Sequence, residues 1–89
     1  MKIKLELFGA SRDFSNKDHI EFQIKEKTEI KDFRKEIIGY LEKNFKGNEN
    51  FKKIVATSAF CSEDNNIISE NYIISKNQKI GIIPPIGGG

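Results

Sequence analysis

The chain closes with the stretch Lys79-Ile80-Gly81-Ile82-Ile83-Pro84-Pro85-Ile86-Gly87-Gly88-Gly89, from which the fold can be worked out. Its first half is apolar and β-branched, which is typical of a buried strand and predicts an inner position in a sheet. The strand has to end at Pro84, because neither proline can donate a hydrogen bond to a neighbouring strand. Two consecutive prolines also favour an extended, polyproline-like path. The stretch therefore predicts a core strand that leads directly into an extended tail.

The tail ends in three glycines. Glycine has no Cβ atom, so this tip is thin enough for a narrow channel, and no side chain obstructs attack on the carboxylate of Gly89. Glycine-rich ends are also typical of frayed termini. A linker, however, seldom begins directly after a core strand. We therefore expect residues 1–83 to form one domain and residues 84–89 to form an extended, flexible tail whose carboxylate is available for chemistry.

Upstream of this stretch, two segments alternate polar and apolar residues at period two. Residues 2–7 place Ile3, Leu5 and Leu7 on one face, and residues 20–24 repeat the pattern. Residues 15–18 between them have good turn chemistry. These segments are expected to form an antiparallel hairpin with one buried face.

A helix is expected to follow, with Thr28 as its N-cap and Gly47-Asn48 as its end. An apolar stripe at steps of three and four residues runs along it, formed by Ile30, Phe33, Ile37 and Leu41. Residues 54–60 are interpreted as the next strand, paired through a turn at 62–66 with Ile67-Ile68. This order predicts an α+β fold in which one main helix packs across a mixed sheet.

Length and composition exclude several classes of protein. A chain of 89 residues has room for one compact domain. Its 15 basic and 13 acidic side chains give little reason to expect nucleic-acid binding. No apolar run is long enough to span a membrane or to form a signal peptide, and a lone Cys61 fits the reducing cytoplasm. With one histidine, His19, and one cysteine, no zinc site is expected.

The sequence resembles the ubiquitin-like β-grasp sulfur carriers, and specifically the small subunits of molybdopterin synthase. Residues 83–89 match that family's ending of an apolar residue, Pro-Pro, an apolar residue, a small residue and Gly-Gly. Residues 7–13 are similar to its aromatic, small, then Arg-acidic segment after the first strand. The chain departs from the family at 57–66, which is longer and richer in Asn, and at 76–79, which is basic. The resemblance implies a β-grasp fold.

The resemblance also implies a mechanism and partners. A ubiquitin-activating-like adenylyltransferase would use ATP to convert the Gly89 carboxylate into a transient acyl-AMP, with no cofactor bound permanently. Sulfur from a donor such as a cysteine desulfurase or a rhodanese would then replace AMP. The Gly89 thiocarboxylate would enter the large subunit of molybdopterin synthase, in an assembly of two small and two large subunits. There it would donate sulfur to cyclic pyranopterin monophosphate during molybdenum cofactor biosynthesis.

The candidate site residues follow from these expectations. Gly88 and Gly89 would carry the chemistry, and the following residues would bind partner proteins: Arg12, Phe60, Pro84, Pro85, Ile86 and Gly87. For Arg12, an ordinary loop cation and an interface or tail-anchoring role are both open. Cys61 is more often a packing residue than a sulfur relay. His19 is expected to be a plain surface or edge residue.

Three other functions remain open at this point. The same adenylation chemistry would serve a sulfur carrier for thiamine or another product. A ubiquitin-like modifier would join Gly89 to a lysine of another protein. A noncovalent β-grasp interaction module would bind its partner without using the tail.

Overall fold

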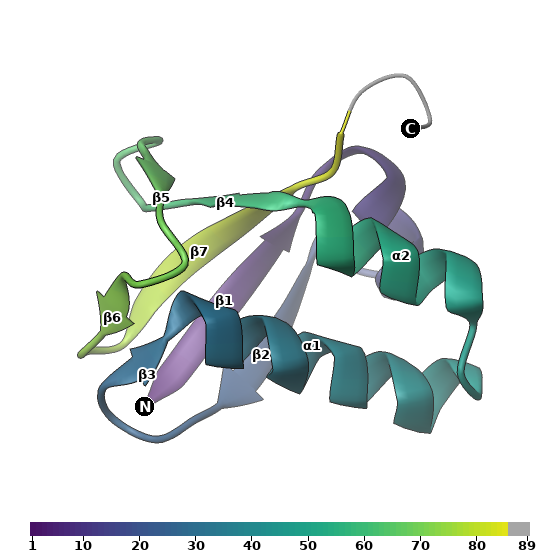
Figure 1. Ribbon diagram of the computed structural model, residues 1–89, viewed down its shortest axis with the longest axis horizontal. Helices are drawn as coiled ribbons and strands as arrows, with labels where there is room; N and C mark the ends of the chain where they lie inside the picture. Colours follow the sequence, from purple (N-terminus) through teal and green to yellow (C-terminus); the bar gives the residue numbers. More distant parts are fainter. Residues whose placement is uncertain (86–89) are drawn as a thin grey trace.

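The computed structural model describes residues 1–85, and the expected tail residues 86–89 lie outside this range. Its main element is a five-stranded sheet in the order β2-β1-β7-β4-β5 (Figure 1). The strands are β1 (Lys2–Leu7), β2 (His19–Gln23), β4 (Ala59–Cys61), β5 (Ile67–Ile68) and β7 (Gln78–Ile83). β1 and β7 are parallel and the other neighbours are antiparallel. The mixed sheet with β7 at its centre confirms the prediction.

The hairpin of β1 and β2 forms as the alternation predicts. Ile3 pairs with Phe22 and Leu5 with Ile20, so the apolar side chains of both strands share one face. Ile3 and Leu5 are fully buried on that face. Lys2 and Lys4 point to the opposite face and are exposed.

The main helix, α1 (Ile30–Phe45), packs across the sheet (Figure 1). The predicted apolar stripe is buried along its whole length. The predicted N-cap is wrong: Glu29 occupies that position, and Thr28 donates its hydroxyl to the Lys25 carbonyl at 2.6 Å. Thr28 instead belongs to β3 (Thr28–Glu29), which pairs with β6 (Ile73–Ile74). Thr28 thus pairs with Ile74, 46 residues further along the sequence, and does not cap the helix as its local preference suggests.

A second helix, α2 (Glu49–Thr57), replaces the strand expected from residue 54. Asn48 caps it, accepting a hydrogen bond from the Phe51 backbone N–H at 3.1 Å. Phe51, Ile54 and Val55 recur at three- and four-residue spacing, so their side chains face the core together. The apolar run at residues 54–60 favours a strand, but the Asn48 cap and the helical spacing decide the structure.

The turn between the helices and the hairpin after α2 agree with the prediction. α1 ends where Lys46 and Gly47 adopt left-handed backbone angles, with φ of 51° and 73°. β4 pairs with β5 across residues 62–66. The phenylalanines that lie in the core or pack against it include Phe14, Phe22, Phe33, Phe45 and Phe51. Phe14 comes from the 3₁₀ helix η1 (Gly9–Phe14) and its ring lies 5.1 Å from that of Phe51.

Candidate functional site

The root of the tail is packed against the body of the domain. β7 ends at Ile83, Pro84 is buried and Pro85 is exposed. Gly9 opens η1 with a φ of +55°, and a Cβ atom there would lie 3.8 Å from Pro84 Cδ. The 3₁₀ helix is therefore in contact with the first proline. Pro84 is therefore buried beside the start of η1, at the point where the chain leaves the sheet.

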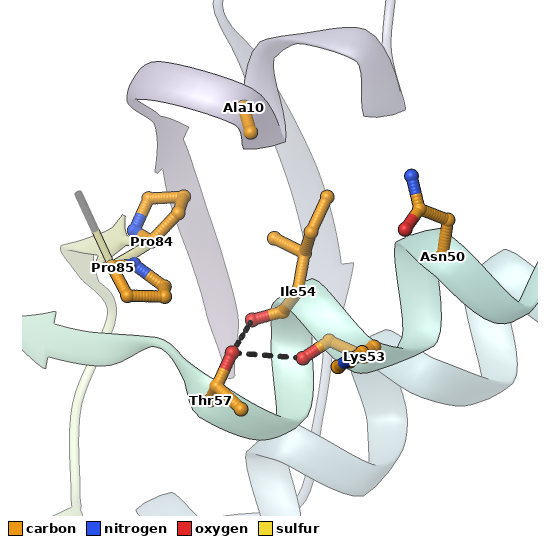
Figure 2. A pocket seen from close by; sticks show the side chains of 7 residues that line it. All are labelled: Ala10, Asn50, Lys53, Ile54, Thr57, Pro84 and Pro85. Carbon is orange, nitrogen blue, oxygen red and sulfur yellow. Dashed lines mark hydrogen bonds between the residues drawn. The ribbon is translucent and has the colours of Figure 1, made fainter. Parts of the chain in front are cut away.

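A pocket of about 450 Å³ lies beside this exit point (Figure 2). It is lined by residues of η1, α2 and the tail root: Ala10, Asn50, Lys53, Ile54, Thr57, Pro84 and Pro85. The Thr57 hydroxyl is 2.9 Å from the Lys53 carbonyl oxygen and 3.4 Å from that of Ile54, so it is held to the helix backbone. Ile54 and the prolines supply apolar walls. Within residues 1–85, Lys53 forms no ion pair, so its positive charge is available to a ligand. The pocket therefore combines an apolar floor with a cationic rim.

The sheet face opposite α1 carries an apolar surface close to the tail root. The register places Gly81, Cys61 and Ile67 in one row across β7, β4 and β5. An added Cβ atom on Gly81 would lie 2.7 Å from Cys61 Sγ and 2.8 Å from Phe8 Cε2. The Phe8 ring and the thiol therefore close over this glycine. Phe8 is 44% exposed and Ile67 is 66% exposed. We call Phe8, Cys61, Ile67 and Gly81 the Phe8 surface.

The structure corrects one predicted contact residue and adds another. Phe60 is 1% exposed and faces α1, so the prediction that it joins a contact surface is wrong. Its row is buried because Phe60 pairs with Ile82 and Ile68, whose side chains share the core face. Phe8 was missed. In β1 the side chains of Lys2, Lys4 and Glu6 point away from the core, and the same period of two places Phe8 next on that outer face.

The other predicted partner-binding residues lie in η1, in the pocket lining or beyond the described range. Arg12 is exposed in η1, and within residues 1–85 its side chain forms no ion pair or hydrogen bond. Pro84 and Pro85 line the pocket. Ile86 and Gly87, and the expected reactive pair Gly88 and Gly89, lie outside the described residues.

The remaining titratable candidates do not form a catalytic cluster in the described part of the chain. Cys61 is the buried member of the Phe8 surface, and its Sγ packs over Gly81. His19 has a carboxylate partner after all: its Nδ1 lies 2.9 Å from Asp18 Oδ1. This hydrogen bond lowers the pKa of Asp18 from its usual 3.8. Across residues 1–85, no group of His, Cys, Asp and Glu is arranged to hold a metal ion. No helix in that range is long and apolar enough to cross a membrane.

Comparison with solved structures places this geometry among known folds. The chain is similar to a candidate molybdopterin converting factor, subunit 1, from Pyrococcus furiosus, with a TM-score of 0.69 and 22% identity over 96% of this chain and 98% of that one. It is also similar to SAMP1 from Haloferax volcanii, with a TM-score of 0.69 and 12% identity over 100% of both chains. No protein-family model and no curated protein matches it. Together with the mixed sheet and the helix across it, these likenesses show that the chain has the β-grasp fold of ubiquitin-like proteins.

Proposed function

We propose that this protein is a sulfur carrier that acts as the small subunit of molybdopterin synthase. The observation that carries the proposal is the direct passage from the central strand β7 into Pro84 and Pro85. Contact with η1 gives the final residues a fixed starting point, and the sequence there ends in Gly88-Gly89. The fold likeness to a candidate molybdopterin converting factor subunit supports the same assignment.

The chemistry requires only a free carboxylate from this chain. The Gly89 carboxylate oxygen attacks the α-phosphorus of ATP, and pyrophosphate leaves. A sulfide equivalent from a donor protein then attacks the acyl carbon, so a C–S bond forms, the C–O bond to phosphate breaks and AMP leaves. In the large subunit the thiocarboxylate sulfur forms a C–S bond with cyclic pyranopterin monophosphate and displaces an oxygen substituent there. Water then cleaves the thioester link to Gly89, so the sulfur stays on the acceptor and the Gly89 carboxylate is regenerated. Partner proteins supply the acid–base groups for each step.

Two surfaces beside the tail root would dock these partners. The Phe8 surface presents apolar side chains, which protein interfaces bury at their centres. The pocket beside Pro85 adds an apolar floor with Lys53 and Asn50 at its rim. A partner that takes the tail into its own channel has to approach this edge of the domain. The adenylyltransferase and the large subunit would therefore bind this edge of the domain one after the other.

Intact-mass spectrometry tests the carrier role. The chain is incubated with a ubiquitin-activating-like adenylyltransferase, ATP and a sulfur donor. A mass increase equal to the exchange of one oxygen for sulfur is expected in the full chain and absent from a chain that lacks Gly88 and Gly89. The truncated chain should keep the same thermal unfolding midpoint. Full molybdopterin synthase activity with the truncated chain would refute the mechanism.

A second β-grasp function, that of a ubiquitin-like modifier, would use the same Gly88-Gly89 ending. In that case Gly89 would form an isopeptide bond with a lysine of another protein. Lysine-linked adducts in cells, lost when Gly88 and Gly89 are deleted, would favour this function over sulfur transfer. Partner binding that survives the deletion unchanged would instead indicate a noncovalent interaction module.

A further inference from the structure

One edge of the sheet presents unused backbone hydrogen-bonding groups. β2 is the terminal strand of the sheet. Met1 and Ile24 exchange two backbone hydrogen bonds, of 2.7 and 2.9 Å, and the Leu7 N–H donates to the Asp18 carbonyl at 2.9 Å. The alternation of an antiparallel ladder then directs the N–H and C=O groups of the odd-numbered residues of β2 away from β1. No hydrogen bond joins these outward groups to any other segment within residues 1–85.

A cleft of about 370 Å³ lies next to this edge, between β2 and α1. It is lined by Phe22, Glu36, Gly39, Tyr40, Lys43 and Asn44. The Phe22 ring packs edge-on against Phe33, with centroids 5.4 Å apart, and against Tyr40 at 5.8 Å. These aromatic contacts hold Phe22 in place, so the cleft has a rigid apolar floor.

Gly39 keeps this cleft open, although the packing of the chain does not require a glycine there. It lies inside α1, where glycine costs about 1 kcal/mol relative to alanine. A Cβ atom added to Gly39 would meet no atom within 4 Å, and its backbone is helical. A larger side chain would therefore stabilise α1 and fill the cleft. Because Gly39 has no side chain, the cleft has room for a side chain from another protein.

The two ends of the cleft carry opposite charges. Lys43 and Glu36 lie on its lining, and within residues 1–85 neither is in an ion pair. Glu36 also lines a second hollow, and that hollow is lined by Ile24, the residue that follows β2. Glu36 therefore lies at the end of the cleft that is nearer to Ile24. Lys43, two helical turns further along α1, marks the end toward Ile20. An occupant that matches both charges carries an acid at the Ile20 end and a base at the Ile24 end.

We propose that an extended segment of a partner protein binds this edge as an additional antiparallel strand. Its backbone pairs with the outward groups of His19, Glu21 and Gln23, the β-augmentation mode of peptide recognition. A residue opposite Phe22 directs its side chain to the same face as Phe22, into the cleft, and is apolar. The residues two positions before and after it are basic and acidic, in that order, and face Glu36 and Lys43. This inference does not depend on the proposed sulfur-carrier function.

A labelled-protein titration tests the binding mode. The full-length, ¹⁵N-labelled chain is titrated with the peptide acetyl-Lys-Thr-Leu-Thr-Asp-amide and followed by ¹⁵N–¹H NMR. Saturable shifts are expected at the amides of His19, Glu21, Gln23 and Gly39. The matched control, acetyl-Lys-Leu-Thr-Thr-Asp-amide, has the same composition but directs its leucine to the opposite face. It should bind at least about tenfold more weakly, a difference of about 1.4 kcal/mol.

Variants at Gly39 separate binding from folding. Gly39→Leu should raise the thermal unfolding midpoint and weaken the first peptide at least about tenfold, a difference of about 1.4 kcal/mol. Gly39→Ala should also raise the midpoint but keep most of the affinity, since it adds one methyl group. Absence of saturable shifts in the unsubstituted chain, or unchanged affinity in Gly39→Leu, would overturn the proposal. Concentration-dependent shifts of the same amides without peptide would also overturn it, because the occupant would then be a second copy of the chain.

Discussion

The guanidinium carbon of Arg34 lies 4.8 Å from the centroid of the Phe60 ring. The same guanidinium donates to the backbone carbonyls of Val55 and Ser58, at 2.6 and 2.8 Å, and forms an ion pair with Glu70. One side chain of α1 thus reaches the end of α2, the residue before β4 and the segment before β6. It pairs the Ser58 carbonyl and adds a second donor to the Val55 carbonyl, which also accepts from the Ser58 backbone N–H at 3.3 Å. Arg34 therefore holds α2, and with it one wall of the pocket, against α1.

Replacing Arg34 tests this role. Arg34→Met keeps an apolar stem but removes every hydrogen bond of this side chain. Within residues 1–85 this leaves the part-buried Ser58 carbonyl unpaired, while the Val55 carbonyl keeps the Ser58 backbone N–H at 3.3 Å. The substitution should lower the free energy of unfolding by about 1–3 kcal/mol. The matched control is Lys35→Met at the next position, whose side chain is 79% exposed and, within residues 1–85, forms an ion pair with Asp32 alone. This control should change stability by no more than about 0.5 kcal/mol. Urea unfolding gives both values, and equal values would contradict the role assigned to Arg34.

Two glycines should respond in opposite ways to the same substitution. Gly81→Ala places a methyl group 2.7 Å from the buried Cys61 Sγ, which has little room to move, and should destabilise the fold by about 1–3 kcal/mol. Gly39→Ala meets no neighbouring atom and should stabilise it by up to about 1 kcal/mol. Thermal and urea unfolding of both variants measure the pair. A Gly81→Ala protein as stable as the parent would show that the Phe8 surface is looser than the structure indicates.

The Phe8 surface should contribute to docking under the proposed function. Phe8→Ser removes its largest exposed side chain and should weaken binding to the large subunit of molybdopterin synthase at least about tenfold, or 1.4 kcal/mol. Ile73→Ser is the control, because Ile73 is similarly exposed but lies on β6, in the separate two-stranded pair. Isothermal titration calorimetry provides the comparison. Equal losses in both variants would remove the Phe8 surface from the interface.

The Asp18–His19 pair predicts a local pH dependence. The hydrogen bond from His19 lowers the pKa of the Asp18 carboxyl below 3.8. A depressed pKa in the folded state means that Asp18 adds stability above pH 3.8, and that this contribution is lost as the pH falls through the folded-state pKa. In His19→Phe the pKa of Asp18 should rise toward 3.8. A carbon-13 NMR titration of the carboxyl groups measures it, and an unmoved pKa would contradict the assigned cause.

The parts of the fold that could be predicted depend on short-range patterns. Period-two alternation identified β1 and β2 together with their buried face, and the stripe from Ile30 to Leu41 identified α1. Both patterns state which side chains share a face, a property of the local backbone geometry. The prediction failed where two local signals competed. The apolar run from residue 54 indicated a strand, but Asn48 caps a helix there. Thr28 had the chemistry of a cap but pairs with Ile74.

By itself, the sequence determined the hairpin of β1 and β2, the helix α1, the central strand β7 and the proline-glycine ending. Only the tertiary structure decided which faces are covered. It buries Phe60 under Arg34, exposes Phe8 above Gly81, packs η1 onto Pro84 and leaves the β2 edge and its cleft open. The physical reason is that periodicity groups side chains on a face of one element, whereas burial depends on contacts between elements far apart in sequence. Those contacts form only when the chain has folded.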